Sequence, residues 1–146
     1  MFMPGKDPEI INKILNHPDV YPWVCGPMTG YLDCAPFFEK KENAMFAGDG
    51  WAAAFLKIAD GIYDLHSMSL PEKRGKETIK IARDLIDFFF DNYQANVLTT
   101  MCPVMNRGAI GLARICGFKK YDTLKDFYPY MGKMYDTDLY MRRRCQ

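Results

Sequence analysis

Short apolar runs separated by glycine-containing turns fill the middle of the chain. They are NAMFA, WAAAFLKIA and GIYDLHSMSL, at residues 43–47, 51–59 and 61–70. Runs of this length between turn residues predict β-strands. The dipeptide Asp60-Gly61 is a strong signal for a two-residue hairpin, and Gly48-Asp49-Gly50 forms the other turn. We therefore predict three consecutive antiparallel strands, with an interior position for WAAAFLKIA because both of its faces are apolar.

Helical periodicity flanks these strands on both sides. An N-terminal helix is predicted after Asp7, a candidate N-cap, with Ile10, Ile11, Ile14 and Leu15 on its apolar face. A helix from about Gly75 to Asn92 has apolar residues at helical spacing: Thr78, Ala82, Leu85, Ile86, Phe89 and Tyr93. The run VMNRGAIGLARICGF predicts another helix, with Gly117 as its C-cap. Residues 20–42 are rich in proline and glycine and are expected to be mainly loop, with a short helix near 37–41.

Three further strands complete the prediction, at ANVLTTM, FKKYDTL and DTDLYMRRR. The order is helix, three strands, helix, strand, helix, strand, strand. A strand–helix–strand unit after an antiparallel meander implies a mixed sheet. We therefore predict an α/β (α+β) fold over residues 1–146 as a single domain, with a mostly antiparallel central sheet flanked by helices.

Composition narrows the functional classes. A formal net charge of +1 gives no electrostatic argument for nucleic acid or an acidic membrane as a partner. The odd number of cysteines, the absence of a C-x-x-C pair and the lack of a secretory leader predict reduced thiols in the cytoplasm. A metal site from Cys25, Cys34, His17 and His66 matches no zinc spacing, so no metal is expected.

A basic turn precedes the helix predicted from Gly75. Lys73, Arg74 and Lys76 surround this glycine in SLPEKRGKETIK. One explanation is solubility, since a helix entry is usually exposed. The other is an anion, because a helix N-terminus offers unpaired N–H groups and the positive end of the helix dipole.

Two motifs in this order resemble the GNAT superfamily of acyl-CoA N-acyltransferases. Its central strand ends in a loop resembling P-x-x-R-G-x-G-x-G/A. Pro71, Arg74, Gly75 and Lys76 stand where that pattern begins. The family often carries N-x-x-A and then G-F farther on. Asn106, Ala109, Gly117 and Phe118 match these positions, and the resemblance covers roughly residues 43–125.

The resemblance implies an N-acetyltransferase that uses acetyl-CoA as co-substrate and an amine as acceptor. It also implies that the central strand diverges from its neighbour, with residues 68–70 opposite residues 98–100 and a backbone N–H near Met68 as oxyanion donor. The expected coenzyme contacts are Met68, Ser69, Leu70, Arg74, Gly75, Lys76, Glu77, Thr78, Ile79 and Asn106. Asn106 could equally be the N-cap of its helix.

Three positions depart from the family pattern. Glu77 and Ile79 stand where small residues let backbone amides approach the pyrophosphate. Glu77 could instead complement the helix dipole. Ala113 stands where many members have a tyrosine that can protonate the leaving thiolate.

Strand alternation places Asp64 and His66 on one face. Histidine can accept a proton near neutral pH, so His66 is the candidate base, and Asp64 could orient it or bind a cationic substrate. The alternative is a hydrogen-bonded structural histidine.

A second resemblance extends over most of the chain. HPDVYPWV, YDLHSMSLPEKRGK, P-x-x-N and GF look like a GNAT-like subgroup common in tailed-phage genomes. It leaves open a non-catalytic GNAT-fold phage structural or accessory protein. If the chain is phage-encoded, the cytoplasm is that of the bacterial host. A homodimer is compatible with these readings. A different anion-binding α/β module is the weakest alternative, because neither G-x-x-x-x-G-K-[ST] nor G-x-G-x-x-G occurs.

Overall fold

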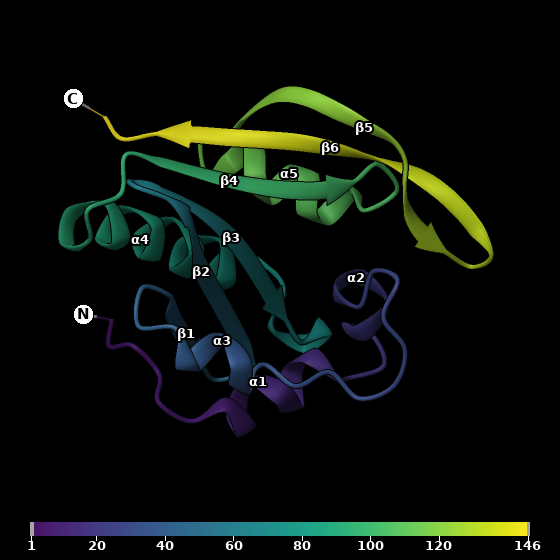
Figure 1. Ribbon diagram of the computed structural model, residues 1–146, viewed down its shortest axis with the longest axis horizontal. Coiled ribbons are helices and arrows are strands. Elements are labelled where there is room, and N and C mark those ends of the chain that lie inside the picture. Colours follow the sequence, from purple (N-terminus) through teal and green to yellow (C-terminus); the bar gives the residue numbers. More distant parts are fainter. Residues whose placement is uncertain (1, 146) are drawn as a thin grey trace.

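A six-stranded mixed sheet organises the chain in the computed structural model, which describes residues 2–145 (Figure 1). The strand order is β1-β2-β3-β4-β6-β5, and all neighbouring pairs are antiparallel except β3 and β4. The strands are β1 Ala44–Gly48, β2 Trp51–Ala59, β3 Ile62–Ser69, β4 Val97–Pro103, β5 Lys119–Tyr130 and β6 Lys133–Arg143. The predicted mixed, mostly antiparallel sheet and the interior position of WAAAFLKIA, which is β2, are therefore confirmed.

Both predicted turns of the meander are present. β1 and β2 pair up to Gly48↔Trp51 across Asp49-Gly50, and β2 and β3 pair from Ala59↔Ile62 across Asp60-Gly61. Gly50 and Gly61 have φ of 76° and 73°, the left-handed conformation in which glycine is favoured.

Two long helices cover one face of the sheet. They are α4, Lys76–Asn92, and α5, Arg107–Ile115. Buried residues of both helices share one core with β1–β4, β6 and Phe118. Phe89 of α4 is at its centre, stacked between Phe55 at 3.9 Å and Tyr93 at 4.3 Å between ring centroids. The apolar spacing that predicted α4 thus corresponds to its buried face.

A smaller core lies on the opposite face, beneath α1, Pro8–Leu15. The Asp7 side chain caps α1 by accepting a hydrogen bond from the Glu9 N–H at 2.9 Å, as expected of an N-cap. Ile11 and Ile14 are buried. The prediction was wrong for Ile10, which is 50% exposed because it lies on the solvent side of the helix.

The loop-rich segment contains two short helices, α2, Tyr21–Val24, and α3, Ala35–Glu39. The predicted short helix near 37–41 corresponds to α3, shifted toward the N-terminus. A 3₁₀ turn, Pro71–Lys73, connects β3 to α4.

The β5–β6 hairpin is longer than predicted and extends past the rest of the sheet (Figure 1). Its turn is Met131-Gly132, with φ of 50° and 77°. The Tyr128 hydroxyl donates to the Pro22 carbonyl at 2.5 Å, and Tyr130 stacks on Trp23 at 4.9 Å. These contacts join the far end of the hairpin to α2.

Burial predicts an order of thiol reactivity. Cys34, Cys102 and Cys116 are buried, and burial raises the pKa of Cys34 and of Cys102 to about 11. Cys145 is exposed. We expect a thiol reagent such as DTNB to label Cys145 first in the native chain. The Cys145→Ser variant should lose that fast phase, and a fast phase that persists would contradict the described burial.

Candidate active site

The central feature of the site is the divergence of the two parallel strands. β3 and β4 pair only at Ile62↔Val97, Tyr63↔Leu98 and Asp64↔Thr99, after which they separate (Figure 1). The Thr100 hydroxyl donates to the Leu65 carbonyl at 2.9 Å, at the start of the separation. The divergence was expected, but its predicted register was wrong. Leu98 and Thr99 belong to the paired part, so the diverging part of β4 begins at Thr100.

Backbone groups of β3 point into this separation. The Leu70 N–H donates to the Gly50 carbonyl of the β1–β2 turn at 2.8 Å. Because alternate residues of an antiparallel strand bond to the same neighbour, the amide of Met68 also faces β2. The amides of Ser67 and Ser69 therefore face β4, beyond its last pairing with β3. The N–H groups best placed to bind a ligand are those on either side of Met68.

A short polar chain lies at the point of separation. His66 Nε2 is 2.8 Å from Asp64 Oδ2, and the other oxygen of Asp64 accepts a hydrogen bond from the Thr99 hydroxyl at 2.8 Å. The His66 side chain is 46% exposed, whereas that of Asp64 is 18% exposed. A neutral imidazole that donates through Nε2 keeps Nδ1 free to accept a proton. Asp64 thus holds His66, and Thr99 holds Asp64.

Sequence reasoning missed Thr99, because its contact depends on the parallel register of β3 and β4. Threonine is common in strands, so residue type alone does not single it out. The predicted shared face of Asp64 and His66 was the available signal, and the structure brings these two side chains together.

The N-terminus of α4 begins where β3 and the 3₁₀ turn end. Gly75 is the residue before the helix, with φ of 145° and ψ of −162°, a conformation that is essentially restricted to glycine. The Ile79 N–H makes the first helical hydrogen bond, to the Gly75 carbonyl at 3.0 Å. The amides of Lys76, Glu77 and Thr78 therefore have no partner within the helix. The Glu77 side chain is exposed, and the Thr78 hydroxyl donates to the Lys73 carbonyl.

Most basic side chains near this turn have partners. Lys73 pairs with Asp49 at 2.6 Å, and this hydrogen bond raises the pKa of Lys73. The Arg74 guanidinium donates to the Ser69 carbonyl at 3.2 Å and to the Asp19 carbonyl at 3.3 Å. Lys80 pairs with Asp84. Among the described residues, Lys76 is the cation of this turn that forms neither an ion pair nor a side-chain hydrogen bond.

Asn106 and Ala113 occupy structural positions on α5. The Asn106 side chain caps this helix by accepting from the Ala109 N–H at 3.1 Å. That bond uses the side-chain oxygen, so the side-chain NH2 group keeps its two donors for another partner. Ala113 is buried in the main core, which also contains Tyr140 of β6.

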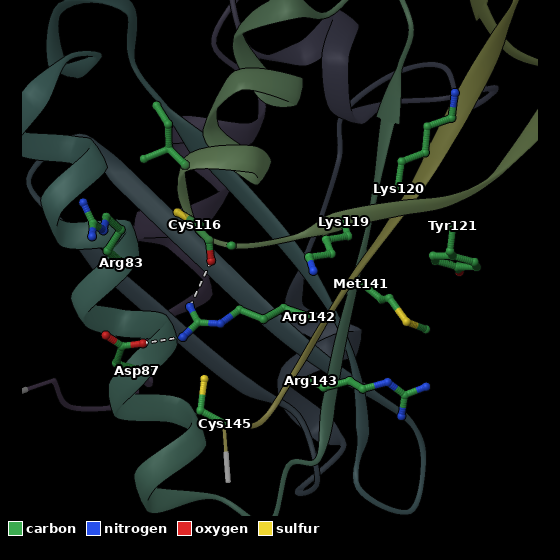
Figure 2. Close-up of a pocket in the computed structure, with 12 residues that line it drawn as sticks. Arg83, Asp87, Cys116, Lys119, Lys120, Tyr121, Met141, Arg142, Arg143 and Cys145 are labelled. Carbon is green, nitrogen blue, oxygen red and sulfur yellow. Dashed lines mark hydrogen bonds and ion pairs between the residues drawn. The ribbon is translucent and has the colours of Figure 1, made fainter.

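The larger cavity, of about 680 Å³, lies away from these residues, between α4, the end of α5 and the strands β5 and β6. Arg142 crosses it, donating to Asp87 at 2.8 Å and to the Cys116 carbonyl at 2.9 Å (Figure 2). Lys120 and Arg143 point away from Arg142 in this view. A cavity of about 230 Å³ along α4 is lined by Lys76 and Ile79 among others.

The described residues contain neither a metal-binding cluster nor a helix suited to a membrane. Residues 2–145 contain no group of three or more His, Cys, Asp or Glu side chains that could hold a metal ion. No helix in the same range is both long and apolar enough to cross a bilayer.

Comparison with known proteins gives a match at the level of structure. No protein-family model and no curated protein matches the sequence. Spermidine N-acetyltransferase from Vibrio cholerae, solved with CoA and spermine, superposes with a TM-score of 0.80 at 14% identity, over 98% of this chain and 94% of that one. A putative phosphinothricin N-acetyltransferase superposes with a TM-score of 0.80 at 11% identity, over 100% of this chain and 99% of that one. A GNAT-family acetyltransferase from Bacillus anthracis superposes with a TM-score of 0.71 at 14% identity, over 97% of each chain. The chain has the fold of the GNAT acetyltransferases.

Proposed function

We propose that the protein is an N-acetyltransferase that transfers an acetyl group from acetyl-CoA directly to an amine. One observation carries the proposal: the His66–Asp64 pair lies on β3 just where this strand leaves β4, so a base and free backbone amides meet at one place. The GNAT fold and the likeness to N-acetyltransferases solved with CoA support it. We place the protein in the cytoplasm, a setting in which the odd number of cysteines and the absence of a C-x-x-C pair fit reduced thiols.

The coenzyme would bind along the end of β3 and the start of α4. The acyl-pantetheine arm would hydrogen-bond the backbone of Ser67 and Ser69. The pyrophosphate would lie against the free amides of Lys76, Glu77 and Thr78, where the helix dipole favours negative charge. Gly75 gives the backbone the turn that aims these amides away from the helix.

Transfer requires one proton acceptor and one oxyanion site. The nitrogen of the neutral amine forms a bond to the thioester carbonyl carbon, and His66 Nδ1 accepts a proton from that nitrogen as the bond forms. The backbone N–H of Ser67 or Ser69 stabilises the developing oxyanion. The carbon–sulfur bond breaks, and the CoA thiolate takes a proton from water or from the His66 imidazolium. Ala113 supplies no tyrosine proton, but a thiol is acidic enough to leave as the thiolate without one.

Calorimetric titration with acetyl-CoA tests the coenzyme site. A substitution at Glu77 predicts the direction in which the affinity should change. Removing one charge about 6 Å from a phosphate, at an effective dielectric constant of about 40, relieves about 1 kcal/mol. Glu77→Gly should therefore bind acetyl-CoA a few-fold more tightly than the parent. Its free energy of unfolding should fall by up to about 1 kcal/mol from helix propensity.

Matched variants separate the causes. Glu77→Gln removes the charge without introducing a glycine. Glu72→Gln removes an exposed carboxylate from the 3₁₀ turn before α4. Lys76→Ala should weaken binding, and added salt should weaken it further, since part of the attraction is electrostatic. No binding by parent or variant would reject the proposed function. Binding without turnover on any amine would favour the non-catalytic alternative, such as a phage structural or accessory protein.

A further inference from the structure

An uncovered strip of side chains crosses the sheet beside the His66–Asp64 pair. It consists of Thr99 and Met101 of β4 and Leu139 and Met141 of β6, paired as Thr99↔Met141 and Met101↔Leu139. Met101 is 42% exposed, and Leu139 and Met141 are half-buried. None of the three apolar residues belongs to either core. Among residues 2–145, neither core cluster extends over this apolar surface.

The absence of a cover follows from the positions of the helices. The alternate residues Leu98 of β4 and Tyr140 of β6 point to the other face and are buried in the main core with α4 and α5. α1 covers the strip's own face only over β1–β3, where Ala52 and Ala54 belong to the smaller core. β4 and β6 therefore present partly exposed apolar side chains on this face.

The strip is continuous with the proposed base. Thr99 pairs with Asp64 in the sheet and donates a hydrogen bond to its carboxylate. The row then continues through Met141 to Lys119 of β5. At about 4.8 Å per strand, Lys119 lies about 14 Å from Asp64. An acceptor whose amine reaches His66 would lay the rest of its body on this strip.

The charges around the strip oppose a polycation. Asp64 is the carboxylate at its inner end, and both of its oxygens are already bonded. Lys119 and Arg143 stand at the far end, and neither forms an ion pair with another described residue. One exposed carboxylate, Asp122, lies opposite Leu139 at the sheet edge and accepts from the Thr123 N–H at 2.8 Å. An extended polyamine anchored at His66 would carry its distal ammonium groups over methionine toward two cations.

We propose that the acceptor is an apolar monoamine: a primary amine on a hydrophobic body with no second cationic centre. This inference rests on the proposed function, and it sets the protein apart from the neighbour solved with spermine. The methionine side chains suit such a body because they adapt to irregular apolar shapes.

The test compares two amines with the full-length chain and saturating acetyl-CoA. 2-Phenylethylamine represents the apolar monoamines and spermidine the polyamines. Acetylated product is measured by mass spectrometry to obtain kcat/KM for each amine. We expect 2-phenylethylamine to be favoured by about tenfold or more, the scale on which a hydrophobic site discriminates. A preference for spermidine would overturn the inference and leave the proposed function standing.

Variants locate the preference on the strip. Met101→Asp should lower kcat/KM for 2-phenylethylamine by about tenfold and leave the affinity for acetyl-CoA unchanged. Met134→Asp is the matched control, since Met134 is similarly exposed, at 52%, but lies near the hairpin turn. Replacing Lys119 and Arg143 by glutamate should lower the ratio of kcat/KM for 2-phenylethylamine to kcat/KM for spermidine. Equal effects of the two methionine variants, or no turnover of either amine although acetyl-CoA binds, would reject the inference. If the protein does not bind acetyl-CoA, the proposed function itself is rejected.

Discussion

Replacing His66 by alanine is expected to lower kcat by about 10²–10⁴-fold, the usual contribution of a positioned general base. The imidazole is half exposed, is held by Asp64 at 2.8 Å and lies where β3 leaves β4. The KM for acetyl-CoA should change little, because the proposed coenzyme contacts are backbone groups of β3 and α4. Steady-state kinetics with a saturating amine separates the two parameters.

Two further variants distinguish a base from a structural histidine. His66→Gln can keep a hydrogen bond to Asp64 but cannot carry the proton, so it should be as inactive as the alanine variant. Full activity in His66→Gln would mean that the side chain only holds Asp64. His17→Ala is the matched control, because His17 is the other histidine and accepts a local hydrogen bond from the Asp19 N–H.

Replacing Phe89 by alanine is expected to lower the free energy of unfolding by about 3–5 kcal/mol. Phe89 is fully buried, stacks on Phe55 and on Tyr93, and makes an edge contact with Tyr63 at 5.0 Å. The loss combines buried apolar area with aromatic contacts that alanine cannot replace. A domain of this kind has only about 5–15 kcal/mol of stability in total, so the variant would be marginal.

Urea denaturation followed by circular dichroism measures this loss. Phe127→Ala is the control, since Phe127 is 47% exposed and an exposed side chain should cost about 0.5 kcal/mol or less. A loss below 1 kcal/mol for Phe89→Ala would show that this stack is not the centre of the core.

The sequence predicted those elements whose signals are local. Glycine turns bounded β1–β3, and helical spacing placed Leu85, Ile86 and Phe89 on the buried side of α4. The alternation of side chains along a strand predicted that Asp64 and His66 share a face. The extent of the β5–β6 hairpin was missed, because Lys125 and Asp126 interrupt the apolar pattern at a bulge and the turn uses Met131, an unusual residue at positive φ.

Contacts between distant segments explain what else was missed. Lys73 and Arg74 look like free cations in the sequence, yet Lys73 pairs with the Asp49 carboxylate and the Arg74 guanidinium donates to the backbone carbonyls of Ser69 and Asp19. Pairings of this kind exist only after the chain has folded, so a basic motif overstates the charge left for a ligand. The register that begins the strand divergence at Thr100 is a tertiary property for the same reason.

The position of β6 has a consequence for biosynthesis. β6 follows β5 in the chain, but it lies between β4 and β5 inside the sheet. While the chain is being translated, β5 has no neighbour to pair with, and β4 keeps an open edge next to the nascent site. We infer that the acceptor side of the protein cannot assemble until residue 143 has left the ribosome. A stop codon before β6 would therefore release an intermediate that contains all five α-helices but leaves β5 unpaired and one edge of β4 open, which is a substrate for chaperones and proteases rather than a shortened enzyme.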